Sequence, residues 1–322
     1  MTVLVTGASG MLGRAVAGHL LAEGLAVRCF QRRPSGVDGA TDVPGSITDG
    51  AAVAAAVDGC RAVVHLAAKV SFTGRAADFE QTNIEGTRLL LDAAQRAGVT
   101  DVVYVSSPSV AHDGTSLVGA SAGPADPAHA RGHYARTKAA AELLALGRSG
   151  PGFRVAAVRP HIVWGPGDTQ LVERVIGRAR AGRLPLLDGG TALIDTTYVD
   201  NAAAAIVACL HRIDAAQGQA LVVTNGEPRP IAELLAGICR AAGVPPPAWS
   251  VPGTLARGVG AVIERAWLAL GRADEPPMTR FLAEQLSTAH WFDQRRTRAV
   301  LDWVPAVSIE QGFDRLARHY GR

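Results

Sequence analysis

The stretch that decides the fold is Thr2-Val3-Leu4-Val5-Thr6-Gly7-Ala8-Ser9-Gly10-Met11-Leu12-Gly13, at the start of the chain. Its first four residues predict a buried strand, and its glycines form a GxxGxxG pattern that leads into a helix-like segment. Gly7 permits a tight turn, Gly10 lets the backbone approach a pyrophosphate, and Gly13 lets the helix lie close to the sheet. The helix N-terminus would direct N–H groups at the phosphates. This context favours a dinucleotide-binding loop over an ordinary glycine-rich turn.

Apolar and amphipathic segments alternate along the first half of the chain. Strands are expected over Thr2–Val5, Ala26–Phe30, Ala62–Leu66, Asp101–Ser106 and Arg154–Val158, and helices over Met11–Glu23, Ala51–Val57, Phe79–Ala97 and Tyr134–Leu146. The strands are continuous apolar runs, as expected for strands that are covered on both faces. The alternation predicts an α/β fold with a doubly wound parallel sheet of the Rossmann type.

The pattern loosens after Pro160, where Gly and Pro become frequent in residues 165–167 and 245–247. A helix over Asp200–Leu210 and a strand over Leu221–Thr224 then restore it. We therefore expect residues 1–164 to form a dinucleotide-binding domain, to which residues 196–225 return. Residues 165–195 and 226–322 should mainly form a smaller, discontinuous C-terminal substrate domain.

Composition narrows the function classes. The 322 residues are 48% hydrophobic and carry a formal net charge of +3 without a dense Lys/Arg run, so nucleic acid is not an expected partner. The cysteines Cys29, Cys60, Cys209 and Cys239 are far apart, which indicates buried free thiols in a reducing compartment. No His/Cys/Asp cluster has metal-ligand spacing. With no signal-peptide pattern and no window of about 18 apolar residues, we expect a cytoplasmic protein without a metal.

The end of the second expected strand bears on the choice of nicotinamide. An enzyme that uses NAD would place an acid near Gln31 to hold the ribose 2′-hydroxyl, but Arg32 and Arg33 follow instead. A guanidinium can bind a 2′-phosphate through charge-assisted hydrogen bonds. A basic surface loop would look the same, yet the pattern favours NADP(H) over NAD(H).

Tyr134 and Lys138 are four residues apart in an expected helix, which places both on one face. A phenol has a pKa near ~10, and a neighbouring ammonium would lower it. The phenol could then deliver a proton to a carbonyl oxygen as hydride arrives at the carbon. Such a pair also occurs by chance, but here the glycine loop precedes it and Ser106-Ser107-Pro108-Ser109 follows a strand at the ligand-binding edge. Together these features predict a nicotinamide-dependent oxidoreductase.

Several motifs, in this order, make the chain resemble the extended short-chain dehydrogenase/reductase superfamily. They are Thr6–Gly13, His65–Ala68, Asn83–Thr87, Ser106-Ser107, Tyr134 with Lys138, Arg159-Pro160 leading to Gly165–Gly167, and Tyr198–Asn201. They span roughly the first two-thirds of the chain. Within the superfamily, the sequence is most similar to the 3β-hydroxysteroid-dehydrogenase-like branch.

The resemblance implies a role for each matching residue. Tyr134 would be the general acid, Lys138 would assist it and bond the nicotinamide ribose, and Ser107 would orient the substrate, with Ser106 as the alternative. The implied cofactor-binding residues are Gly7, Ser9, Gly10, Met11, Leu12, Gly13, Arg32, Arg33, Ser46, Ile47, Leu66, Ala67, Ala68, Lys138, Pro160 and Ile162. Ser46 stands near the place where the family often has an aspartate beside the adenine. The segments Phe79–Ala97 and Tyr134–Leu146 resemble the helices through which the superfamily commonly dimerises, so a homodimer is implied.

A narrower resemblance concerns the substrate side. The run Glu275–Leu286, together with Ser107–Val110 and Trp164–Asp168, is similar to enzymes that reduce 2-alkyl-3-oxoalkanoic acids in bacterial long-chain olefin biosynthesis. It implies NADPH-dependent reduction of the 3-keto group of a long-chain β-keto acid, and it would allow peripheral contact with lipid or with enzymes of the same pathway. A hydroxysteroid dehydrogenase, a sugar-nucleotide epimerase or dehydratase, and a redox-sensing binding protein are the alternatives.

Other residues have competing interpretations. The segment Leu255–Leu270, which contains Trp267 and Leu268, could line an apolar channel, pack as an ordinary helix, or lie at a lipid interface. His65 is expected to be structural, and His161 to be a satisfied polar residue at the edge of the cleft. Asn83 could orient water or backbone near the site, but its simpler role, and the one expected, is to cap a helix.

Overall fold

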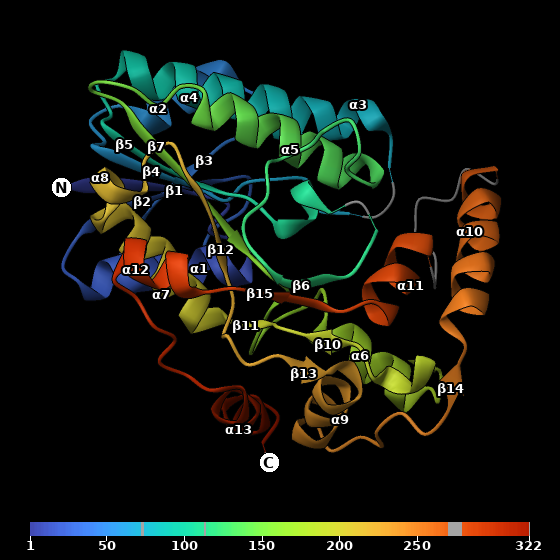
Figure 1. Ribbon diagram of the computed structural model, residues 1–322. Coiled ribbons are helices and arrows are strands. Elements are labelled where there is room, and N and C mark those ends of the chain that lie inside the picture. The colour runs from blue at the N-terminus through green and yellow to red at the C-terminus, as the bar shows by residue number, and fades with distance from the viewer. Residues whose placement is uncertain (72–73, 113, 270–278, 322) are drawn as a thin grey trace.

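A computed structural model describes residues 1–71, 74–112, 114–269 and 279–321 (Figure 1). Its central sheet contains β1 (Thr2–Thr6), β2 (Ala26–Gln31), β3 (Thr41–Pro44), β4 (Ala62–His65), β5 (Asp101–Val105), β7 (Arg154–Pro160) and β12 (Ala220–Val223). The order across the sheet is β12-β7-β5-β4-β1-β2-β3, and all neighbouring strands are parallel. This order is that of a Rossmann fold, which confirms the expected fold class. The expected strands all form, with ends that differ by one or two residues.

Helices cover both faces of this sheet (Figure 1). One face carries α2 (Gly50–Val57), α4 (Gly86–Arg96) and α5 (Gly132–Leu146), and the other carries α1 (Met11–Ala22), α7 (Val199–His211), α8 (Ile213–Ala216) and α12 (Arg295–Leu301). Each layer has its own hydrophobic core against the sheet. The covering helices are rich in alanine, whose small side chain permits close approach. Ala202, Ala203 and Ala205 of α7, for example, are fully buried.

The strand β3 is the element of the central sheet that the sequence did not indicate. It reads Thr-Asp-Val-Pro, lies at the edge of the sheet, and is mostly exposed. An edge strand tolerates proline and polar residues because one side of it needs no partner. It therefore lacks the apolar run that marks the other strands.

The helix that was expected over Phe79–Ala97 begins earlier and is not uniform. It consists of α3 (Ala76–Phe79), a π-helical turn over Glu80–Glu85, and α4. Asn83 lies inside the π-helical turn, so the expectation that it caps a helix is wrong. Its Oδ1 accepts from the backbone N of Lys69 at 2.7 Å, and its Nδ2 donates to Oγ1 of Thr137 at 3.0 Å. Asn83 therefore ties the segment after β4 to α5, and π-helical turns are frequent at functional sites.

Smaller sheets and further helices pack beyond the carboxyl ends of the central strands (Figure 1). A second sheet has the order β13 (Arg229–Pro230), β10 (Leu193–Ile194), β15 (His290–Phe292) and β6 (Leu117–Ala120). There are also two separate two-stranded sheets. One pairs β8 (Val163–Trp164) with β11 (Thr197–Tyr198), and the other pairs β9 (Leu186–Leu187) with β14 (Ser250–Val251). The helices here are α6 (Val172–Arg180), α9 (Ile231–Ala241), α10 (Gly253–Ala269), α11 (Arg280–Ser287) and α13 (Ile309–His319). The sequence boundaries between two domains remain a prediction.

Three expectations drawn from composition can be compared with the structure. All four cysteines are free and buried, as predicted. Within the described ranges, no group of His, Cys, Asp and Glu side chains is arranged to hold a metal ion. No helix in that part of the chain is both long enough and apolar enough to cross a membrane.

Candidate active site

The glycine loop after β1 has the geometry that a pyrophosphate requires. Gly7 adopts a φ of +76°, and a Cβ there would lie 2.9 Å from the backbone N of Ala67. A Cβ on Gly13 would lie 2.4 Å from the carbonyl oxygen of Gly7, whereas Gly10 is exposed and faces open space on most sides. No side chain caps the N-terminus of α1, so the N–H groups of its first turn are available to a ligand. These residues fit a dinucleotide, and Ser9, Met11 and Leu12 lie at the same turn, half-buried.

Hydrogen bonds fix the segment after β4 against this loop. Oγ1 of Thr6 accepts from the backbone N of Leu66 at 3.1 Å and of Ala67 at 3.0 Å. The imidazole of His65 is fully buried between Thr6 and Thr87, at 2.7 and 3.0 Å. Burial lowers the pKa of His65 to about 3, with Lys138 acting in the same direction. His65 is therefore a neutral structural residue, as expected, and not a base.

The residues expected near the adenosine end lie at the ends of β2 and β3. Arg32 and Arg33 are exposed directly after β2. The amide of Gln31 donates to Asp42 at 2.8 Å, and the carboxylate of Asp42 also accepts from the backbone N of Ser35. The nearby acid is thus already hydrogen-bonded to protein. Ser46 and Ile47 follow β3. The hydroxyl groups of Ser46 and Thr48 are hydrogen-bonded to each other, and Ile47 is buried. Ala68 follows β4 and is half-buried.

The helix α5 brings Tyr134 and Lys138 to the carboxyl edge of the sheet. Tyr134 lines a cavity, and burial raises its pKa to about 12, while a hydrogen bond with Ser107 acts in the opposite direction. Nζ of Lys138 donates to the carbonyl oxygen of Val105 at 2.6 Å and lies 4.1 Å from the ring centroid of Tyr104. The expected lowering of the Tyr134 pKa by Lys138 is not seen here: burial raises this pKa, and the opposing contribution comes from Ser107.

Lys138 itself is only 3% exposed, and burial lowers its pKa to about 7. Glu142, one turn further along α5, acts in the opposite direction. The carboxylate of Glu142 is paired with Arg159 of β7, at 2.5 Å between Nη2 and Oε1, and both side chains are buried. This pair fixes α5 on β7, so the backbone that presents Tyr134 and Lys138 is held in register with the sheet.

Ser107, and not Ser106, lines the cavity beside Tyr134. The hydroxyl oxygen of Ser107 accepts from the backbone N of Ser109 at 3.3 Å and from its hydroxyl at 3.0 Å. Because these two donors occupy its lone pairs, the remaining proton of Ser107 is free to donate toward Tyr134 or a substrate oxygen. Oγ of Ser106 is buried within the sheet edge.

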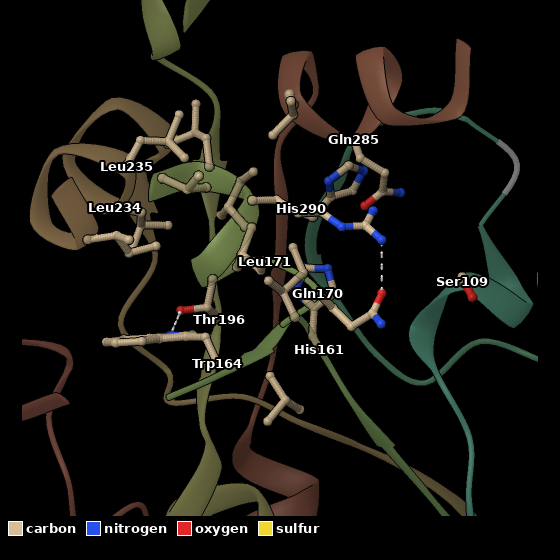
Figure 2. A pocket seen from close by; sticks show the side chains of 18 of the residues that line it. Ser109, His161, Trp164, Gln170, Leu171, Thr196, Leu234, Leu235, Gln285 and His290 are labelled. Carbon is tan, nitrogen blue, oxygen red and sulfur yellow. Dashed lines mark hydrogen bonds between the residues drawn. The ribbon is translucent and has the colours of Figure 1, made fainter. Parts of the chain in front are cut away.

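The cavity, of about 350 Å³, extends from Ser107 and Tyr134 to a wall of aliphatic side chains. α9 contributes Leu234 and Leu235, which Figure 2 shows on the side opposite Ser109. Trp164 forms part of the lining and donates from Nε1 to Thr196 at 2.9 Å (Figure 2). A space of this kind suits an apolar substrate with one polar reacting end.

In the view of Figure 2, His161 and His290 lie between Ser109 and the two leucines of α9. The Nδ1 of His161 lies 2.6 Å from the carbonyl oxygen of Asp195, as expected for a satisfied polar residue, and the ring also lines the cavity. Nε2 of His290 lies 2.9 Å from Nε2 of His112. Burial lowers the pKa of His161 to about 4 and that of His290 to about 3. Both rings are therefore neutral at physiological pH.

The segment after β7 carries the last expected cofactor contacts. Pro160 ends β7, and Ile162 lines the cavity with a φ of +43°. A β-branched residue in the left-handed region costs about 1–3 kcal/mol, and such strain concentrates at functional sites. The backbone N of Thr197 donates to the carbonyl oxygen of Ile162 at 3.2 Å and helps to hold this conformation.

Three interpretations of Leu255–Leu270 were open, and the described side chains do not follow the one in which it lines the cavity. None of the α10 side chains that the structure describes, in residues 253–263 and 265–267, is part of the lining. α10 packs on α11 instead, and Leu255, Val259 and Val262 are exposed. Leu270 and residues 275–278 of the run Glu275–Leu286 lie outside the described residues. Gln285 and Leu286, at the end of that run, do line the cavity.

The arrangement of a glycine loop, a Tyr/Lys pair and a serine at one sheet edge can be compared with known proteins. The model of the NAD dependent epimerase/dehydratase family matches residues 3–224. The chain belongs to this family. It is an extended short-chain dehydrogenase/reductase and therefore an NAD(P)-dependent oxidoreductase.

Curated relatives match almost the whole chain. A 2-alkyl-3-oxoalkanoate reductase of Stenotrophomonas maltophilia is 39% identical over 325 residues, which cover 98% of each protein. A protein of the same name from Shewanella oneidensis is 36% identical and is matched over 97% of this chain and 84% of the relative. A 3-beta-hydroxysteroid dehydrogenase of Mycolicibacterium neoaurum is 32% identical, with coverage of 99% and 91%.

Solved structures agree on the fold. The crystal structure of gox2253 has a TM-score of 0.78 at 25% identity and covers 99% of this chain and 98% of its own. MoeE5 in complex with UDP-glucose and NAD has a TM-score of 0.76 at 22% identity, with coverage of 100% and 99%. At that identity the likeness to MoeE5 concerns the fold alone.

Sequence reasoning missed the residues in and just before α6 that line the cavity. Arg174, Val175 and Arg178 of α6 contribute to its wall, as do Gln170 and Leu171 of the preceding turn. Arg174 and Arg178 are four residues apart and lie on one helix face with Val175 beside them. That spacing was visible in the sequence, but only the fold shows that the face is turned toward Tyr134.

Proposed function

We propose that the protein reduces the 3-keto group of a long-chain 2-alkyl-3-oxoalkanoic acid to the 2-alkyl-3-hydroxy acid, with NADPH as the reductant. The observation that carries the proposal is the cavity itself, in which Ser107 and Tyr134 stand at one end of an otherwise mostly aliphatic space. A β-keto acid with two alkyl chains has one polar end and a large apolar remainder. The names and high coverage of the two reductase relatives support the same substrate class.

The reaction chemistry follows from the protonation states of the site. Tyr134, with its pKa raised to about 12, is a neutral phenol at physiological pH and can donate a proton to the substrate carbonyl oxygen. Ser107 can donate a second hydrogen bond to that oxygen because Ser109 occupies its lone pairs. A bound nicotinamide would supply the hydride. Lys138 would bond the nicotinamide ribose and help to return a proton to Tyr134.

Preference for NADPH is the part of the proposal that depends on Arg32 and Arg33. Both guanidinium groups are exposed after β2, where they can reach a 2′-phosphate. Replacing both by Ala should weaken NADPH binding by about tenfold or more, the scale of charge-assisted hydrogen bonds, and leave NADH binding unchanged. Calorimetric titration with each cofactor measures the difference. Equal affinity of the unmodified protein for both cofactors would overturn the preference.

The substrate proposal is tested by NADPH oxidation with three substrate classes side by side. A 2-alkyl-3-oxo acid, a 3-keto steroid and a UDP-sugar represent the reductase and its two enzyme alternatives. The steroid class is included because a hydroxysteroid dehydrogenase is among the relatives. Turnover is expected with the oxo acid. Turnover with the steroid or the UDP-sugar alone would reject the proposal, and no turnover with any of them would favour a binding protein. In a pathway to olefins, the hydroxy acid would be the product handed on.

We also propose that the protein is a homodimer that assembles through α4 and α5. These helices pack side by side on one face of the sheet, and Leu143 of α5 is 47% exposed (Figure 1). Sedimentation velocity should show a dimer at micromolar concentration, and Leu143→Arg should shift it toward monomer. A monomer in both samples would reject the assembly.

A further inference from the structure

Charge is distributed unevenly over the wall of the cavity. Among its described lining residues there is no Asp or Glu, and the side chains with a permanent positive charge are Arg174 and Arg178. His161 and His290 line the same space, but burial lowers the pKa of each far below neutrality. Those two rings supply no positive charge at physiological pH. Of these two arginines and two histidines, only the arginines, which both belong to α6, are positively charged at physiological pH.

The two arginines belong to one ridge of α6. Arg174 and Arg178 are four residues apart on α6, with Val175 beside them, and the turn just before the helix adds Gln170 and Leu171 to the same part of the lining. Arg174 and Arg178 are half-buried, whereas Arg180, on another face of the same helix, is exposed. The helix thus offers a polar stripe and an apolar stripe side by side to whatever occupies the cavity.

The start of α6 is held firmly, which fixes the direction of the polar ridge. The buried carboxylate of Asp168 accepts from the backbone N of Gln170 at 2.8 Å and from that of Val172 at 3.1 Å. Oε1 of Gln170 in turn accepts from Nη2 of Arg174 at 3.4 Å, and Figure 2 shows this bond beside His161. The guanidinium also lowers the pKa of Asp168, which burial raises. Gln170 is exposed and Arg174 is half-buried, so this bond places the guanidinium at the part of the cavity wall that solvent reaches.

We propose that Arg174 binds the substrate carboxylate, with Gln170 orienting its guanidinium and Arg178 adding positive charge one turn further along. This inference rests on the proposed function and names the subsite for the acid group. A carboxylate is ionised at neutral pH, and next to an aliphatic space it binds best to a cationic hydrogen-bond donor. The apolar side chains of Leu171 and Val175 then border the alkyl chains. The pairing selects an acid over a neutral ketone or ester with the same chains.

The test compares an acid with its ester in the oxidative direction, because β-keto acids lose carbon dioxide readily and β-hydroxy acids do not. A 2-alkyl-3-hydroxy acid and its methyl ester are oxidised with NADP⁺ by the unmodified protein, Arg174→Met, Arg174→Lys and Arg178→Met. Arg174→Met keeps the apolar stem and removes the charge. Arg180→Met, on the exposed face of the same helix, is the matched control.

The unmodified protein is expected to prefer the acid. Arg174→Met should lower the acid-to-ester ratio of kcat/KM by about 10- to 100-fold through KM, the scale of a charge-assisted hydrogen bond. Arg174→Lys should restore part of the ratio, Arg178→Met should lower it less, and Arg180→Met should leave it unchanged. An unchanged ratio in Arg174→Met, or an unmodified protein that does not prefer the acid, would overturn the inference.

A binding measurement separates this inference from the proposed function. Calorimetric titration of the hydroxy acid and the ester into each variant reports the carboxylate contact without turnover. If the unmodified protein oxidises neither compound, the proposed reaction fails. The subsite still stands if the acid binds more tightly than the ester and Arg174→Met removes the difference. If binding is equally tight for both, the subsite fails as well.

Discussion

The two ends of the cavity are built by different rules. At the catalytic end, Ser107 follows β5 of the central sheet, and Tyr134 and Lys138 belong to α5, which packs on that sheet. Hydrogen bonds fix Ser107 and Lys138 in place. At the far end, Leu234, Leu235 and their neighbours come from α9 and other elements outside that sheet. Direction matters at the first end, since each proton must point at one atom. Volume matters at the second, since dispersion and apolar burial have no direction.

This difference predicts which property of the enzyme a substitution at each end should change. A hydroxyl or an ammonium removed at the catalytic end leaves the shape of the protein and changes the reaction. A side chain enlarged at the aliphatic end leaves the reaction and changes which substrates fit. The predictions below test this separation.

The largest effect is expected at Tyr134. Tyr134→Phe keeps the ring and removes the proton donor, so turnover should fall by about a hundredfold or more, the scale for loss of a general acid. NADPH binding should remain nearly intact, because in the proposed mechanism the phenol contacts the substrate carbonyl oxygen and not the cofactor. Steady-state kinetics and calorimetry measure the two quantities. Near-normal turnover, or a loss that follows thermal stability, would mean that Tyr134 only packs.

Lys138→Ala should damage two functions at once. Its ammonium lies beneath the Tyr104 ring, where it would serve the phenol and the nicotinamide ribose together. Turnover should fall by about 10- to 100-fold, and cofactor affinity by about tenfold, the scale of one charge-assisted hydrogen bond. Loss of turnover with unchanged cofactor affinity would exclude the ribose contact.

The buried ammonium of Lys138 also predicts a pH dependence of stability. Its pKa is about 7 in the folded protein, against an ordinary value of 10.5 when unfolded. Between these two values the unfolded chain binds more protons, so the free energy of unfolding should rise with pH from about 7 to 10.5. Lys138→Met should lose that rise. Denaturant titrations of the cofactor-free protein at several pH values provide the measurement, and parallel curves for both proteins would contradict it.

Chain-length selectivity is expected to change at the aliphatic end. Leu235→Trp places a larger ring in the wall, and each methylene kept out of the cavity costs about 0.8 kcal/mol, roughly fourfold in kcat/KM. The longest substrates should lose about tenfold or more, while short-chain oxo acids keep their turnover. Val262→Trp on the exposed face of α10 is the control. A uniform loss for all chain lengths would show that the two ends are not separable.

The same contrast explains what the sequence could and could not predict. The strands, the glycine loop and the Tyr134/Lys138 pair depend on local patterns, and the structure has the fold that those patterns indicate. The aliphatic wall has no such pattern, because Leu187 and Ile194 sit in two-residue strands while Leu234 and Leu235 belong to a distant helix. Only tertiary packing brings them together.

The pKa values of the site residues could not be predicted from their spacing in the sequence either. The four-residue interval between Tyr134 and Lys138 suggested that the ammonium would lower the pKa of the phenol. Burial, which spacing does not report, raises that pKa instead, and the ammonium of Lys138 donates to the carbonyl oxygen of Val105. The interpretation of α10 stayed open for a similar reason, since apolar composition alone does not say which face a helix buries.

The smallest effect is expected at Ser109, which lines the cavity at the edge of the catalytic end. Its hydroxyl donates to Ser107 at 3.0 Å, and its backbone N donates to the same oxygen at 3.3 Å. Ser109→Ala removes only the first of these bonds, so Ser107 should still be held, though less firmly. We expect kcat to fall a few-fold, on the scale of one neutral hydrogen bond, with KM unchanged.

Two further variants serve as controls. Ser109→Thr keeps the hydroxyl and should restore kcat, whereas Ser107→Ala should lower kcat further. If Ser109→Ala matched Ser107→Ala, the orientation of the Ser107 proton would depend wholly on the neighbouring hydroxyl. If Ser109→Ala had no effect, the backbone bond alone would hold Ser107, and Ser109 would belong to the apolar wall.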